Sequence, residues 1–106
     1  MFPFTLGDDI QKLNDLIQAV KEIGNWKGLC TNLDVSQGKI DALIHSTATV
    51  DAKKAACLQA YFNGGKVKWS EVVKAVAMYP INNIRVAKQI AEAHGLNYNN
   101  IVKDEL

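Results

Sequence analysis

Apolar residues recur along this chain at steps of three and four, which is the spacing of one face of an α-helix. In the first stretch Ile10, Leu13, Ile17 and Val20 fall on one side, and Gly24 ends the pattern. Five further stretches follow with short polar links between them, and none alternates with the period of a strand. The pattern predicts six helices, over about 8–23, 25–33, 36–44, 49–62, 69–78 and 82–94.

Short polar side chains precede most of these stretches, where a helix needs an acceptor for its first N–H groups. Candidate N-caps stand before five of the six helices: Asp8 or Asp9, Asn25, Ser36, Thr49, and Asn82 or Asn83. Trp26 and Trp69 each open a helix, and we expect both to be buried in the core.

Six amphipathic helices joined by short links predict an all-α fold, a compact antiparallel six-helix bundle. We divide the chain into a lead-in over 1–7, the helical domain over 8–95 and a polar C-terminal tail over 96–106. For the tail, a short extra helical turn and an absence of regular structure both remain open.

The composition fits a single globular domain and argues against some classes of binding partner. Of 106 residues, 48% are apolar and 22% charged. Twelve basic and eleven acidic side chains give a net charge of +1, which argues against strong attraction of the whole domain to nucleic acid or anionic lipid. No stretch approaches the ~18 apolar residues of a spanning helix, so we expect no insertion into a membrane.

The two cysteines, Cys30 and Cys57, have 26 residues between them, a spacing that matches no metal or redox motif. We therefore expect two buried, reduced thiols and a cytoplasmic location. We also expect no signal peptide, because Asp8 and Asp9 interrupt any apolar run near the N-terminus and no basic region precedes it. The last four residues, 103–106, spell an endoplasmic-reticulum retrieval signal, which we interpret as a coincidence.

Candidate catalytic chemistry is sparse. His45 and His94 are the two histidines, and His94, in the last turn of a helix, is suited to interact with the helix dipole. Gly64 and Gly65 lack the frame of a phosphate-binding loop. A Cys–His pair formed by folding remains open. We otherwise expect no enzyme activity, cofactor, metal ion or small-molecule substrate.

Four motifs follow one another in order along the chain. They are Asn25-Trp26-Lys27-Gly28-Leu29, Leu58-Gln59-Ala60-Tyr61, the stretch from Lys68-Trp69 to Val76, and Val86-Ala87-Lys88-Gln89-Ile90. In this combination the chain, over about 8–95, resembles the death domain of the death-fold superfamily, whose members are six-helix bundles that associate with one another.

Some positions depart from that family's pattern. Tyr61 stands where another tryptophan is common, Lys68 stands where a threonine or serine cap is common, and Val72 and Val76 replace leucines. The subfamily therefore stays open, including a caspase-recruitment or death-effector relative, although the arginine motif of the latter is not evident around Arg85.

The resemblance implies a non-enzymatic adaptor in apoptotic or innate-immune signalling, which binds other death-fold domains or copies of itself. One implied contact pairs the first and fourth helices (Lys21, Glu22, Asp51, Lys53, Lys54) with the second and third (Asp34, Lys39, Asp41). Another uses Lys66, Lys68, Arg85 and Lys88. Charges of this kind mainly set partner choice and association rate.

The alternative is a helical nucleic-acid-binding domain with a helix-turn-helix in the second and third helices. Lysines at 66, 68, 74 and 88 would then contact phosphates. The near-neutral charge, and Asp41 on the intended recognition helix, argue against this interpretation. An enzyme is the third hypothesis, after the protein-interaction module and the nucleic-acid-binding domain.

Overall fold

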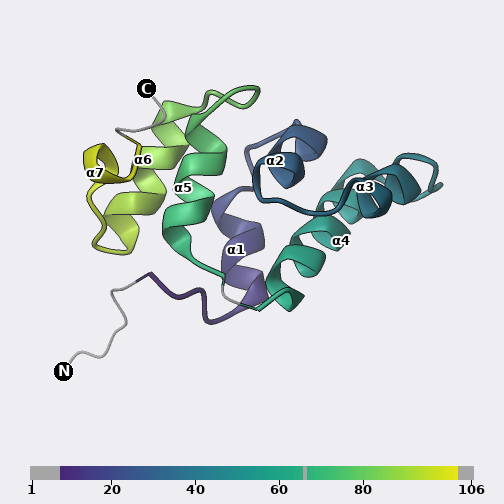
Figure 1. Cartoon of the computed structure of the whole chain (residues 1–106), viewed down its shortest axis with the longest axis horizontal. Helices are drawn as coiled ribbons and strands as arrows, with labels where there is room; N and C mark the ends of the chain where they lie inside the picture. Colours follow the sequence, from purple (N-terminus) through teal and green to yellow (C-terminus); the bar gives the residue numbers. More distant parts are fainter. Residues whose placement is uncertain (1–7, 66, 103–106) are drawn as a thin grey trace.

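The computed structural model describes residues 8–65 and 67–102, and these form seven α-helices with no strand (Figure 1). The helices are α1 (Leu13–Ala19), α2 (Trp26–Asn32), α3 (Gln37–Ile44), α4 (Val50–Asn63), α5 (Trp69–Ala77), α6 (Ile84–Ala93) and α7 (Tyr98–Val102). The all-helical prediction is confirmed, and the six expected helices are present with one more after them.

Four of the expected helix caps are in place. The side chains of Asn25, Ser36, Thr49 and Asn83 each accept a hydrogen bond from the N–H three residues ahead, at 3.0–3.2 Å. Each cap satisfies a donor that the first helical turn leaves free. Helices α2, α3, α4 and α6 therefore begin where the sequence predicts.

The first helix begins later than predicted. Its N-cap is Lys12, which makes no side-chain cap bond, and the residues before it run alongside the link into α5. Asp9 forms an isolated antiparallel bridge with Lys68, and the Ile10 N–H donates to the Val67 carbonyl at 3.3 Å.

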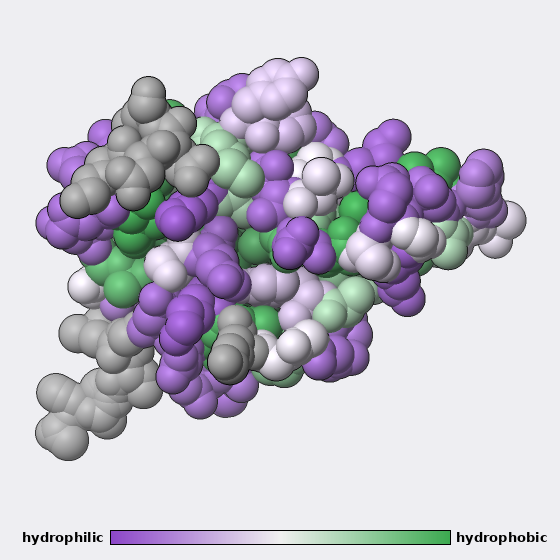
Figure 2. Space-filling model, in the orientation of Figure 1, coloured by the Kyte–Doolittle hydropathy of each residue, from purple (hydrophilic) through white to green (hydrophobic). Residues whose placement is uncertain are grey.

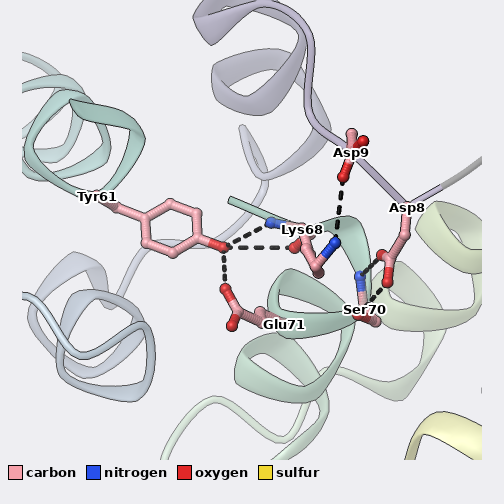
Figure 3. A network of polar contacts seen from close by, with 6 residues as sticks. All are labelled: Asp8, Asp9, Tyr61, Lys68, Ser70 and Glu71. Carbon is pink, nitrogen blue, oxygen red and sulfur yellow. Dashed lines mark hydrogen bonds and ion pairs between the residues drawn. The ribbon is translucent and has the colours of Figure 1, made fainter. Parts of the chain in front are cut away.

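Asp8 caps α5 rather than the first helix, so the expected role of Asp8 or Asp9 at the first helix was wrong. The Asp8 carboxylate accepts the Ser70 N–H at 2.6 Å and the Ser70 hydroxyl at 2.7 Å (Figure 3). The Asp8 carbonyl accepts the Trp69 N–H at 2.6 Å. Because Lys68 supplies no cap of its own, Asp8, which lies 62 positions before Ser70, replaces it.

Helix α5 is central to the main core. Trp69, Val72, Val73 and Val76 are all buried, and the helix packs against α2, α6 and α7. The Trp69 ring stacks on the His94 ring with 4.0 Å between their centroids, which joins the start of α5 to the end of α6.

A second, smaller core lies under α3. Trp26, Cys30, Ile40 and Cys57 form a separate buried cluster, so the two tryptophans are buried in different cores. Helix α3 packs against α2 and α4, and together with the start of α4 it extends to one end of the molecule, at the right of Figure 1. The described residues accordingly span 44 × 31 × 22 Å.

Part of the predicted tail belongs to the main core. Gly95 takes a left-handed conformation with φ of +71°, and the Leu96 N–H returns to the Ala91 carbonyl at 2.8 Å. This turn directs α7 back onto α5 and α6, where Val102 is fully buried. The extra helical turn, one of the two options for the tail, is therefore correct for 98–102.

Replacing Asp8 with alanine should lower the free energy of unfolding by about 0.5–2 kcal/mol, the usual effect of losing an N-cap side chain. The matched control is Asp9→Ala, which removes an exposed ion pair to Lys68 and should cost less than about 1 kcal/mol. Urea denaturation measures both. Equal effects would show that Asp8 does not cap α5.

Candidate interaction surfaces

The site residues expected from the sequence are distributed over the helical surface, with two exceptions. Lys66 lies outside the described residues, and Lys54 is buried. The face seen in Figure 2 is mostly hydrophilic, with apolar side chains in small areas between the charged ones.

Asp34 lies in the turn from α2 to α3, Lys39 and Asp41 lie on α3, and all three are exposed. Asp34 has a left-handed backbone with φ of +67°, a conformation that aspartate tolerates better than most residues. The next N–H, of Val35, donates to the Cys30 carbonyl at 3.0 Å. The turn is therefore fixed by backbone hydrogen bonds, and it holds the Asp34 side chain at the surface.

Asp34 and Lys39 line the same hollow, which has a volume of about 600 Å³ and which we call the Asp34 hollow. It lies between the α2–α3 turn and the end of α4, and it is lined by Leu33, Asp34, Val35, Ser36, Lys39, Ala60, Tyr61, Asn63, Gly64, Gly65 and Val67. The fold thus brings two of the expected binding residues to one concave site.

The wall of this hollow at Tyr61 is part of a polar network (Figure 3). The Tyr61 hydroxyl donates to the Glu71 carboxylate at 2.6 Å and accepts the Lys68 N–H at 3.2 Å. Burial, together with the hydrogen bond to Glu71, raises the pKa of Tyr61 well above its usual range. Two departures from the death-domain pattern, Tyr61 and Lys68, therefore contact each other.

On the α1 and α4 side, Lys21 and Asp51 are exposed. Lys53 is half-buried, and its ammonium lies 3.4 Å from the Ile44 carbonyl. The remaining candidate on this side, Glu22, follows α1 in a turn and is paired within the chain.

Glu22 and Arg85, assigned to two different contacts, bind each other at 2.6 Å. The Arg85 guanidinium, through this hydrogen bond and its charge, lowers the pKa of Glu22. Both side chains are about half exposed, and exposed pairs of this kind contribute little to stability. The pair connects the end of α1 to the start of α6.

The charged end of Lys54 is not exposed at the surface. Its side chain is 7% exposed, and its ammonium donates to the carbonyls of Val20 and Ile23, the latter at 2.7 Å. Burial lowers the pKa of Lys54. The structure corrects the expectation for this residue, because the side chain ties α4 to the end of α1. Helical periodicity alone did not distinguish it from Lys53.

Two further basic candidates, Lys68 and Lys88, also have partners within the chain. Lys68 pairs with Asp9 at 3.2 Å, which raises the pKa of Lys68. The Lys88 ammonium lies 5.5 Å from the centre of the Tyr98 ring, a distance typical of a cation–π contact.

The two histidines, His45 and His94, are the C-caps of α3 and α6. Burial lowers the pKa of His94, although the nearby Asp15 opposes the shift. The position of His94 at the end of α6 is as expected, and the interaction of its charged form with the helix dipole stays a prediction. His45 is exposed at the end of α3. Within residues 8–65 and 67–102, no group of three His, Cys, Asp or Glu residues could hold a metal ion.

No family model, curated protein or solved structure matches this chain. The resemblance to death domains therefore rests on the residues quoted above. Among the described helices, none is long and apolar enough to cross a membrane.

The variant Lys54→Met should lower the free energy of unfolding by about 1–3 kcal/mol, because a buried carbonyl loses its donor. Val20 also accepts the Ile23 N–H, so the Ile23 carbonyl depends most on Lys54. Lys53→Met is the matched control and should change stability by less than about 0.5 kcal/mol. Urea denaturation compares the free energy of unfolding of the two variants. An unchanged free energy of unfolding for Lys54→Met would contradict the proposed structural role of Lys54.

His94 should make stability depend on pH below about 6.5, the ordinary pKa of histidine. The unfolded chain binds a proton there that the folded chain resists, because the pKa of His94 is lowered. Stability is thus fully present above this pH and is lost as pH falls. His94→Phe should reduce the loss between about pH 7 and pH 5, whereas His45→Gln should not. A slope unchanged by His94→Phe would refute this explanation.

Proposed function

We propose that this chain is a non-enzymatic protein-interaction module that assembles with copies of itself or with other death-fold domains. The observation that carries the proposal is the position of Asp34 and Lys39, two charges of opposite sign at one hollow of about 600 Å³. A concave surface with fixed charges is suited to select a partner of complementary charge.

Local hydrogen bonds order the backbone around the hollow. Asp34 stands on a hydrogen-bonded turn, and Ser36, the N-cap of α3, positions the first turn that carries Lys39. The opposite wall is held by Tyr61 through its bond to Glu71. A surface whose turns are already formed loses less entropy when it binds.

Lys21 and Asp51, which the resemblance places in the contact opposite this surface, are also exposed. A contact between two different faces of the same chain does not close on itself, so each added copy presents a free face to the next. Assembly of this kind needs no catalytic group. It supports a scaffold that grows with concentration.

The charge reversal Asp34→Lys with Lys39→Glu should weaken self-association or partner binding at least tenfold, or about 1.4 kcal/mol. Analytical ultracentrifugation over a range of concentrations measures self-association. Titration with purified death-fold domains measures binding to other partners.

The control is Lys27→Glu, an exposed charge on α2 that does not line the hollow, and it should leave binding unchanged. Circular dichroism must show both variants folded. If folded wild-type chain neither associates with itself nor binds any death-fold domain, the proposed function is wrong. Equal loss in both variants would remove the Asp34 hollow from the contact.

A further inference from the structure

Cys30 and Cys57, from α2 and α4, meet beneath α3. Both side chains are fully buried and both are free thiols. They share the small core with Trp26 and Ile40, and each thiol is near enough to affect the pKa of the other. Folding therefore joins two cysteines whose spacing in the sequence indicates no pairing.

We propose that Cys30 and Cys57 form a reversible disulfide when α3 moves away from them, so that the pair is a modification site for small-molecule disulfides. This disulfide can form whether or not the chain has the interaction role proposed above. It requires only that the two thiols be adjacent and that their cover be removable.

Helix α3 is a weakly attached cover. It packs against α2 and α4, which supply the two cysteines. Its buried contribution is Ile40, assisted by the half-buried Leu43, whereas Ile44 is 39% exposed. Elements with few buried apolar contacts open at a smaller cost in free energy than the whole domain. Opening of α3 would expose the thiols while the main core around α5 stays folded.

The closed structure protects both thiols. Burial raises the pKa of Cys30 and of Cys57, so the reactive thiolate is scarce, and no oxidant reaches a fully buried sulfur. With α3 open, either thiol can lose its proton to water and attack one sulfur of the oxidant. A mixed disulfide forms, and one thiolate of the oxidant leaves.

The second cysteine completes the exchange. Its thiolate attacks the protein sulfur of the mixed disulfide, a Cys30–Cys57 bond forms, and the second oxidant thiolate leaves. In total the two cysteines lose two electrons and two protons, and the disulfide oxidant becomes two thiols. Because the partner thiol is already adjacent, this step should be faster than attack by another chain.

The test is to incubate the folded, full chain with oxidised glutathione and to examine it by intact mass and non-reducing peptide mapping. We expect a monomer that has lost two hydrogen atoms, peptides linked through Cys30 and Cys57, and full reversal by dithiothreitol. Stable glutathione adducts or links between chains as the only products would overturn the proposal.

The role of α3 is tested by the rate of this reaction. Ile40→Ala removes the main buried side chain of α3 and should accelerate disulfide formation at least about tenfold, since such a deletion strongly destabilises its surroundings. The matched control Ile90→Ala makes the same change in the main core and should leave the rate near that of the wild type. Equal acceleration by both would mean that global unfolding exposes the thiols, which overturns the opening of α3.

A milder variant protects the test against loss of folding. If Ile40→Ala does not fold, Leu43→Ala, which trims a half-buried contact with the same cluster, takes its place. It should accelerate the reaction by a smaller factor than Ile40→Ala is expected to give. An unchanged rate in a folded Leu43→Ala chain would count against the proposal.

Discussion

The first turn of α5 needs hydrogen-bond acceptors that its own N-cap cannot supply, because Lys68 stands there and an ammonium only donates. Asp8 meets this need from the start of the chain, with its carboxylate on the N–H and hydroxyl of Ser70. The same turn carries Trp69, whose ring stacks on His94 at the end of α6. Most of the main core packs around α5, so the positions of α6 and α7 depend on this turn.

The sequence pattern predicted the features that depend on residues close together in the chain. Helix existence follows from apolar spacing, and the caps at Asn25, Ser36, Thr49 and Asn83 act over three residues. The late start of α1 could not be predicted in this way. It arises because 8–10 pair with 67–69, a contact between distant segments that periodicity does not encode.

The candidate surfaces were predicted less well, and for a related reason. Sequence identifies which side chains carry charge, but the pairing of Glu22 with Arg85 and the burial of Lys54 depend on how distant helices pack. Cys30 and Cys57 show the same limit, since each lies on the apolar side of its own helix and nothing in their spacing indicates that α2 and α4 bring them together. Asp34 and Lys39 lie close together in the sequence, so their proximity at one hollow does not depend on packing between distant helices.

Because the protein has two cores, the two walls of the Asp34 hollow are supported to different degrees. Lys39 stands on α3, and α3 is held by the small cluster of Trp26, Cys30, Ile40 and Cys57 rather than by the core around α5. The Asp34 hollow thus joins a firmly supported wall, at Tyr61, to a weakly supported one. A partner that binds both walls would hold α3 closed, and a closed α3 would in turn favour the partner, as reciprocal coupling between two equilibria requires. Binding at the hollow and exposure of the thiols beneath α3 should therefore oppose each other.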